Sequence, residues 1–282
     1  MLGLGNSLVY AGGVLGVPYV NAFSCEFDGT DDSAEADSYT AVTPGADSAT
    51  GFTVSAWVNS QHGTLANIAQ DRIISKSGSG GNEWAMVIDG GKRLRFFLYF
   101  DNDVNNRYRI FATSAIASVD DWYHVVFTWD ATKDTDDNTA VALYTNGVKA
   151  DVSSGANVTQ VGDSDSLTVT PGTHPVEIGT TSAGATGHYW NGYIDEVSIF
   201  NVALDDDAVT EIYNSGTPID MTKDTGNYDN SSNLVAYWRM GEGDGVDGDA
   251  NGTITNLSSA AGATDLQLEN DAAISSDDYA GI

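Results

Sequence analysis

One short stretch decides the fold class of this chain: Phe52-Thr-Val-Ser-Ala-Trp-Val58. Its apolar side chains occupy alternate positions. One face of the predicted strand carries Phe52, Val54, Ala56 and Val58, and Trp57 lies on the other face. A second stretch, Trp122-Tyr-His-Val-Val-Phe-Thr-Trp129, is apolar on both faces, which is typical of a central strand covered on both sides. Together they predict a sheet buried inside a β protein.

The rest of the chain predicts more strands, tight turns and very little helix. Asn146-Gly147 favours a hairpin, because both residues tolerate the positive φ angles of a type I′ turn. Only residues 205–213 favour a helix, with Asp205 as its N-cap and Val209 and Ile212 on one apolar face. We therefore expect an all-β protein: a two-sheet antiparallel β-sandwich (jelly roll) with one short helix near the end of the domain.

Six motifs occur in a fixed order along the chain. They are Phe27-Asp-Gly-Thr-Asp-Asp32, Phe52–Val58, Ile73-Ile-Ser-Lys76, Trp122-Tyr-His-Val-Val126, Leu143-Tyr-Thr-Asn-Gly147 and Gly192-Tyr-Ile-Asp-Glu-Val197. This succession resembles the laminin-G/pentraxin-like branch of the concanavalin A-like lectin/glucanase superfamily. The resemblance covers about residues 22–216 and implies two stacked antiparallel sheets. It implies no one activity, because members bind sugars, bind proteins or build surfaces.

The chain divides into three predicted segments. Residues 1–21 form an extended apolar arm without Lys or Arg, which lacks the charged start of a secretory signal. We expect Leu2 and Leu4 to be buried in an interface or along an edge of the jelly roll. Residues 22–216 form the jelly roll, and residues 217–282 a polar tail with an added strand at 234–240 and an Asp/Gly loop. We expect residues 255–282 to be ordered only in part, in an assembly.

The charge balance excludes several classes of partner. Lys and Arg number 11 against 40 Asp and Glu, for a formal net charge of -29. A basic surface for nucleic acid is therefore excluded, and docking on anionic lipid is disfavoured. No apolar run approaches the ~20 residues of a membrane span. Cys25 is the one cysteine, so no intrachain disulfide can form.

The resemblance also implies a structural calcium ion near the joined ends of the domain. The matching positions are Asp28 and Asp195, and Asp31 and Asp32 could complete an oxygen shell. No Lys or Arg occurs in residues 1–71 or 150–222 to neutralise these carboxylates. The alternative is that Asp28 belongs to a turn and that Asp195 is a strand-end residue held by backbone N–H groups.

A second candidate metal loop is Asp247-Gly-Asp-Ala-Asn-Gly-Thr-Ile254. It begins like an EF-hand loop, with Asp247, Asp249 and Asn251 as the candidate ligands. Ser258 stands where the bidentate acid of such a loop is expected, and no flanking helices are evident. The segment is either a weak calcium site or an Asp/Gly turn.

The scarce basic residues are concentrated in one part of the chain. Seven of them lie between Arg72 and Arg109. The predicted face consists of Arg93, Arg95, Phe97, Tyr99, Arg107 and Arg109. This cationic, aromatic face suits docking of an acidic neighbour, including another copy of the chain. The alternative is a ladder of cross-strand ion pairs with local Asp residues.

No catalytic constellation is found, so we expect a protein that is not an enzyme. Glycoside hydrolases of this superfamily carry Glu-x-Asp-x-x-Glu on one strand, and that spacing is absent. Asp195 and Glu196 are adjacent, so on a regular strand they face opposite sides. His124 lies in an aromatic strand, where a structural role is expected.

Two functions remain open. The two ends of the chain resemble marine tailed-phage virion proteins, which favours a structural or adhesive surface protein, a capsid decoration or tail/fibre component assembled in multiple copies. Its partners would be other copies or a larger capsid or tail, at the virion surface or outside the cell. The alternative is a carbohydrate-binding lectin-like module, free or part of a polysaccharide-degrading system. Four tryptophans could then stack on sugar rings, although core packing is their usual role: Trp57, Trp84, Trp122 and Trp190.

Overall fold

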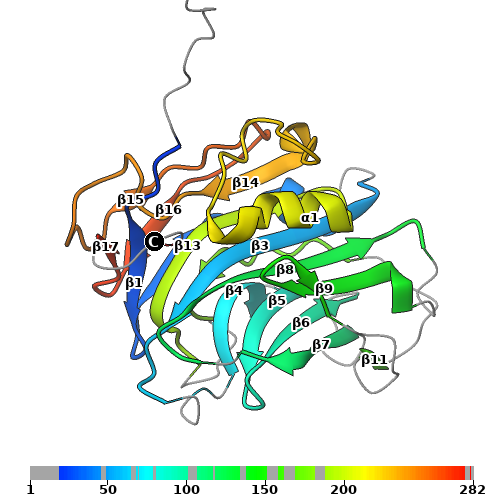
Figure 1. Ribbon diagram of the computed structural model, residues 1–282, viewed down its shortest axis with the longest axis horizontal. Helices are drawn as coiled ribbons and strands as arrows, with labels where there is room; N and C mark the ends of the chain where they lie inside the picture. Colours follow the sequence, from blue (N-terminus) through cyan, green and yellow to red (C-terminus); the bar gives the residue numbers. More distant parts are fainter. Residues whose placement is uncertain are drawn as a thin grey trace, which may run out of the picture.

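The computed structural model describes residues 19–45, 49–64, 68, 70–78, 81–100, 107–116, 118–133, 138–150, 158–161, 169–181, 188–276 and 280. Positions 107–109, 111–115, 138 and 158–161 are described by their backbone alone. Two antiparallel sheets stack on one another and share a hydrophobic core (Figure 1). The predicted all-β sandwich is confirmed.

The first sheet, sheet A, has eight strands. In order across the sheet they are β10 (Val148–Lys149), β9 (Val141–Thr145), β8 (Trp122–Asp130), β3 (Gly51–Ser60), β13 (Asn191–Phe200), β1 (Ser24–Asp28) and β17 (Ala273–Ser275). The eighth strand, β14 (Leu234–Trp238), pairs with β13 beyond the end of its pairing with β1.

The second sheet, sheet B, has nine strands. Their order is β11 (Val158–Val161), β7 (Arg107–Ala115), β6 (Arg93–Tyr99), β5 (Gly81–Asp89), β4 (Gln70–Gly78), β12 (Val176–Ile178), β2 (Ser33–Ala36), β16 (Leu266–Glu269) and β15 (Thr253–Ile254).

Strands β3 and β8 lie side by side in the middle of sheet A, in unbroken register from Gly51 to Asn59. The alternation of β3 is confirmed. The core between the sheets contains Phe52, Val54, Ala56 and Val58, whereas Trp57 points outward. β8 is buried on both faces, with Phe127 in the core between the sheets and Val126 under the helix.

Helix α1 (Asp206–Tyr213) lies across the outer face of sheet A (Figure 1). Asp205 caps it as expected, since its side chain accepts a hydrogen bond from the backbone N–H of Ala208 at 2.8 Å. Val209 and Ile212 pack on the sheet and belong to a second core cluster. In the described part of the chain, no helix is long and apolar enough to cross a membrane.

The segment after Thr217 belongs to both sheets. β14 and β17 extend sheet A, while β15 and β16 extend sheet B beyond β2. These strands and the turns beside them add nine buried side chains to the core between the sheets: Val235, Ala236, Trp238, Met240, Ile254, Leu266, Leu268, Ala272 and Ile274. A division at residue 216 therefore does not separate two packing units. The expectation that residues 255–282 order only in an assembly is wrong for residues 255–276.

We expect Leu268→Ala to destabilise the whole sandwich, because Leu268 is 1% exposed and belongs to the shared core. Removing a buried leucine side chain costs about 2–5 kcal/mol. Leu257→Ala is the matched control, since Leu257 is 42% exposed, and it should change stability by less than about 0.5 kcal/mol. Urea unfolding measures both, and an unchanged main transition for Leu268→Ala would show that the tail is energetically separate.

Candidate functional site

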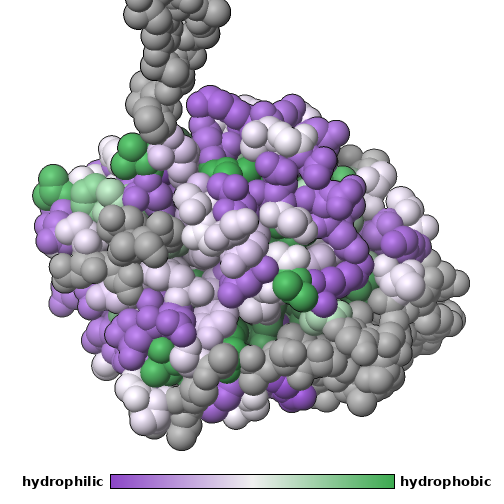
Figure 2. Space-filling view, viewed as in Figure 1, coloured by the Kyte–Doolittle hydropathy of each residue, from purple (hydrophilic) through white to green (hydrophobic). Residues whose placement is uncertain are grey.

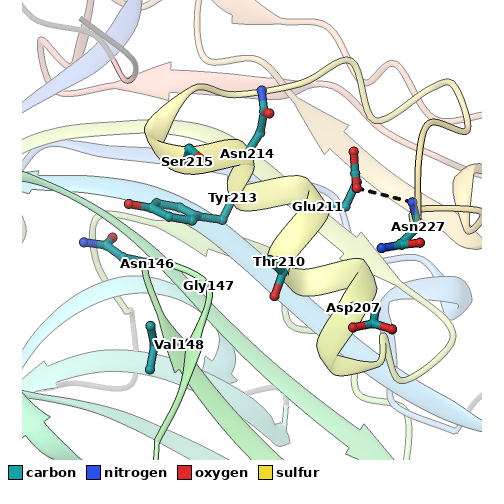
Figure 3. Close-up of a pocket in the computed structure, with 10 residues that line it drawn as sticks. All are labelled: Asn146, Gly147, Val148, Asp207, Thr210, Glu211, Tyr213, Asn214, Ser215 and Asn227. Carbon is teal, nitrogen blue, oxygen red and sulfur yellow. Dashed lines mark hydrogen bonds between the residues drawn. The ribbon is translucent and has the colours of Figure 1, made fainter.

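A pocket opens between helix α1 and the tip of the β9–β10 hairpin (Figure 3). Its volume is about 410 Å³. Its walls carry carboxylate, amide and hydroxyl groups together with one aromatic ring: Asn146, Gly147, Val148, Asp207, Thr210, Glu211, Tyr213, Asn214, Ser215 and Asn227. Such a mixture suits a polar ligand that also presents an apolar face.

The hairpin tip and the helix approach closely at Tyr213. Asn146 and Gly147 have φ angles of 51° and 73°, so the predicted Asn-Gly turn is present. A Cβ atom on Gly147 would lie 2.9 Å from Cδ1 of Tyr213, so only glycine permits this approach. On the other side of the pocket, Glu211 accepts a hydrogen bond from the backbone N–H of Asn227 at 3.3 Å (Figure 3).

Packing on sheet A holds the ring of Tyr213 in place. It stacks on Trp57 at a centroid distance of 5.8 Å and on His124 at 6.0 Å. The orientation of the ring is therefore set by packing before any ligand arrives. Of the four tryptophans considered as sugar platforms, Trp57, Trp84 and Trp190 are at most 2% exposed and cannot serve as such.

Most of the described surface around this pocket is hydrophilic. Figure 2 shows hydrophilic residues over the helix and the adjoining tail, with only small, separate hydrophobic patches. Val148, 70% exposed, is one of the few large apolar side chains that face solvent. A broad apolar docking surface is absent from the described part of this face.

An acidic cluster forms at the turn between β1 and β2. Asp28, Asp31 and Asp32 each offer one carboxylate oxygen, and these oxygens lie within 4.8 Å of one another. Asp32 Oδ2 accepts the backbone N–H of Asp28 at 2.8 Å, whereas Asp32 Oδ1 is buried without a hydrogen-bond partner. Burial raises the pKa of Asp32 to about 6, and the neighbouring carboxylates add to the rise. This oxygen set fits a hard divalent cation.

Asp195 lies far from this cluster, so the expectation that Asp28 and Asp195 flank one ion is wrong. The antiparallel register pairs Asp28 with Asn191 at one end of β1. Ile194, which precedes Asp195, pairs with Cys25 near the other end of β1. The Asp195 carboxylate accepts hydrogen bonds from the Asn21 side chain and from the backbone N–H groups of Glu196 and Ala280. Burial nevertheless raises its pKa well above the usual range.

The three candidate ligands of the Asp/Gly loop point at different backbone groups. Asp247 accepts the backbone N–H of Ser276 at 2.8 Å, and Asp249 that of Val246 at 2.9 Å. Asn251 accepts the backbone N–H of Asp271 at 3.3 Å. These contacts hold the loop against β17 and its preceding turn, which matches the Asp/Gly-turn alternative.

The cationic face lies on the outside of sheet B. Arg93 and Arg95 both donate to Oδ2 of Asp89, at 2.9 and 2.8 Å, as the ion-pair alternative requires. The backbones of Arg107 and Arg109 pair with Tyr99 and Phe97, and their side chains lie outside the described atoms. Docking of an acidic neighbour on this face stays a prediction.

The apolar arm is described only at its end. Leu2 and Leu4 lie outside the described residues. Tyr19 packs against its own domain, where its hydroxyl donates to Glu196 of β13 and its ring faces the Arg239 guanidinium at 4.3 Å. Glu196 has a φ of 48° within a β-bulge, a strand irregularity that the adjacent carboxylates did not reveal in the sequence.

His124 is a structural residue. Its Nε2 lies 2.8 Å from Oγ of Ser55, and both side chains are fully buried beneath α1. Burial lowers the pKa of His124 to about 3, so the ring is neutral at pH 7. A substrate cannot reach this Ser–His pair without unfolding of the helix.

Residues 28–210 match the sequence model of the concanavalin A-like lectin/glucanases superfamily. The chain belongs to this superfamily. The match lies within the segment, residues 22–216, over which the sequence motifs indicated the same relationship. None of the curated proteins compared with the chain is similar to it in sequence.

Solved structures align with the chain at low sequence identity. A candidate carbohydrate-binding protein from Bacteroides ovatus ATCC 8483 aligns with a TM-score of 0.57 and 16% identity over 93% of the chain, which spans 62% of that protein. A heptameric SAP-like pentraxin from Limulus polyphemus aligns at 0.46 and 16% identity, covering 68% of this chain and 82% of that one. The CBM40 domain of a Ruminococcus gnavus sialidase, bound to α2,3-sialyllactose, aligns at 0.46 and 14% identity, covering 67% and 97%.

We expect His124→Gln to flatten the pH dependence of unfolding in acid. Because the folded-state pKa of His124 is depressed to about 3, the residue takes up a proton only on unfolding. Its stabilising contribution is present above the unfolded pKa of about 6.5 and is lost as the pH falls toward 3. The wild type should lose on the order of 1 kcal/mol per pH unit relative to the variant. Urea unfolding from neutral pH downward measures this, and parallel stability curves would contradict a buried neutral ring.

Proposed function

We propose that this protein is a non-catalytic carbohydrate-binding module, with a saccharide held in the pocket beside α1. The observation that carries the proposal is the pocket itself, where a fixed aromatic ring faces carboxylate and amide groups. Membership of a lectin/glucanase superfamily supports it. The Bacteroides ovatus protein, named for carbohydrate binding, supports the same class of ligand.

The lining of the pocket matches the chemistry of a sugar. A pyranose has one face of C–H groups, which can cover the ring of Tyr213, and a rim of hydroxyl groups. Glu211 and Asp207 offer acceptors for those hydroxyls, and Asn227 and Asn146 offer amide groups. The volume of about 410 Å³ is in the range of small-molecule sites, ~300–1,000 Å³.

The titratable residues that the sequence analysis weighed for catalysis are inaccessible within the described structure, which supports binding without catalysis. Asp195 and Glu196 are both fully buried and engaged by hydrogen bonds, and His124 is neutral beneath the helix. Binding rather than bond cleavage is therefore the proposed outcome of saccharide capture.

We expect Tyr213→Ala and Glu211→Gln each to weaken saccharide binding. Uncovering an apolar contact costs ~1.5–3 kcal/mol, or roughly 10- to 100-fold in affinity. Glu211→Gln keeps the shape of the side chain, so it tests the pocket even if Tyr213→Ala loosens the helix. A glycan array identifies the ligand and calorimetry gives the affinities.

The matched control for both variants is Asp229→Asn, which changes an exposed acid outside the pocket. It should bind like the wild type. Wild-type affinity in both pocket variants, or a wild type that binds no glycan, would refute the proposed function.

We further propose that the acidic cluster of Asp28, Asp31 and Asp32 binds a structural calcium ion. Asp32 is 4% exposed, and its unpartnered Oδ1 gives the cluster a buried oxygen that a cation would satisfy. The ion would fix the β1–β2 turn, since all three ligands lie in or beside it. Its role would be stabilising, because the saccharide pocket is built from other elements.

Millimolar calcium should raise the melting temperature of the wild type at pH 7, because an ion bound only to the folded state stabilises it by mass action, by about 2.7 kcal/mol at 100 times Kd. Asp31→Asn and Asp32→Asn should abolish this rise, and Asp229→Asn should retain it. Equal melting temperatures with calcium and with a chelator would refute the site.

The role in a virion stays a prediction from the sequence, as does a location on a particle or outside the cell. The family match and the pocket support saccharide binding better than capsid or tail assembly. Analytical ultracentrifugation tests the multi-copy prediction directly, and it is independent of the glycan array.

A further inference from the structure

The charged side chains that line the pocket beside α1 are all of one sign. Asp207 and Glu211 contribute carboxylates to its walls, and no Lys or Arg belongs to the described lining. The two acids are four residues apart on α1, and Figure 3 shows both on the side of the helix that faces Asn227. Like charges at this spacing repel one another and destabilise a helix. A cation bound beside them would offset this repulsion.

The basic residues in the neighbouring segments neutralise other acids. Lys149 of the hairpin donates to Oδ1 of Asp206 at 2.9 Å. Lys223, which follows the helix, donates to Asp220 at 2.5 Å. Among the described side chains, neither acid of the pocket forms an ion pair with a Lys or Arg. Both carboxylates of the lining are therefore left to a ligand.

Glu211 keeps one carboxylate oxygen for a ligand. Its Oε2 accepts the backbone N–H of Asn227 at 3.3 Å, whereas its Oε1 accepts no hydrogen bond from a described residue. The side chain is half-buried and lines the pocket, so a ligand can reach it. The contact with Asn227 orients the carboxylate before any ligand arrives.

The C-terminal end of α1 adds negative potential to the same pocket. The last backbone carbonyl groups of a helix carry partial negative charge, which stabilises cations placed near them. The last turn of α1 contains Glu211 and no basic residue, and Asn214 and Ser215 at this end line the pocket. The carboxylates and the helix end therefore favour the same ligand charge.

Two neutral side chains of the lining have already given a donor to the backbone. The Thr210 hydroxyl donates to the backbone carbonyl four residues earlier, at 2.8 Å. The side-chain amide of Asn214 donates to the backbone carbonyl three residues later, at 3.1 Å. The oxygens of both side chains can still accept hydrogen bonds. Together with the two carboxylates, they make the pocket rich in acceptors, which suits a ligand that presents donors.

We propose that the saccharide of this pocket is an amino sugar whose ammonium group pairs with Glu211, with Asp207 and the end of α1 adding to the attraction. An ammonium group carries a positive charge and three donors, which match these acceptors. This inference rests on the proposed carbohydrate-binding function and deepens it by naming the class of saccharide.

The charge of the whole chain acts in the same direction. A net charge of -29 attracts cationic ligands to the protein and repels acidic ones. Because Asp207 is exposed and Glu211 is half-buried, dissolved salt screens their attraction for a cation. The affinity for an amino sugar should therefore fall as the salt concentration rises, whereas the affinity for a neutral sugar should not.

Calorimetry with two oligosaccharides of equal length tests the proposal. Oligomers of glucosamine are cationic at mildly acidic pH, and oligomers of N-acetylglucosamine are neutral. The wild type should bind the glucosamine oligomer more tightly by at least ~10-fold, as expected for hydrogen bonds between charged groups. High salt should reduce this preference.

Three variants locate the preference. Glu211→Gln keeps the shape of the side chain and should lose at least ~10-fold in affinity for the glucosamine oligomer, and much less for the N-acetylated one. Asp207→Asn should reduce the preference in part. Asp229→Asn removes the same charge at an exposed acid outside the pocket and should keep the preference.

The remaining outcomes separate this inference from the proposed function. Equal affinity for both oligomers, a preference that survives Glu211→Gln, or an equal loss of preference in Asp229→Asn overturns the amino-sugar class alone. A lysine tripeptide that binds as tightly as the glucosamine oligomer also overturns it, because the pocket would then recognise an ammonium group without a sugar. A wild type that binds no oligosaccharide of any charge overturns both proposals.

Discussion

The structure depends on how β13 satisfies two buried carboxylates. One edge of β13 pairs with β3, while the other pairs first with β1 and then, after a bulge, with β14. Asp195 and Glu196 lie at the change of partner and are fully buried. Buried carboxylates are costly unless hydrogen-bonded, so the bulge is stable only with its donors in place. Those donors come from the start of the described chain and from the segment after Thr217. They are the Asn21 side chain and the Ala280 backbone for Asp195, and the Tyr237 and Arg239 side chains for Glu196.

This requirement explains why the segment after Thr217 is part of the sandwich. β14 occupies the half of the β13 edge that β1 leaves open, and it is followed by Arg239, the cation that neutralises Glu196. β16 and β17 then continue the outer edges of both sheets. The proposed saccharide pocket lies on the outer face of this closed sandwich, at α1 on sheet A.

The sequence predicted what depends on local pattern. The alternation in Phe52–Val58, the Asn146-Gly147 turn and the Asp205 cap each follow from neighbouring residues, and each is present. The prediction that Asp28 and Asp195 lie together is wrong. The two residues are some 170 positions apart, and the register that decides their distance is set by the pairing of β1 with β13, which no local pattern encodes. From the sequence, Tyr213 was expected only on the apolar face of the helix. Its role in the pocket could not be predicted, because it depends on contact with the hairpin tip at Gly147.

The pairing of β1 with β17 has a consequence for the architecture of larger proteins. Ser24 lies opposite Ser275, so the segments that lead into and out of the sandwich begin at neighbouring points on one edge. A host protein could carry this fold as an insertion within a surface loop, joined by two short linkers, without separating the ends of the interrupted loop. Such a graft would leave both the hairpin tip and the outer face of sheet B free, because neither lies at that edge.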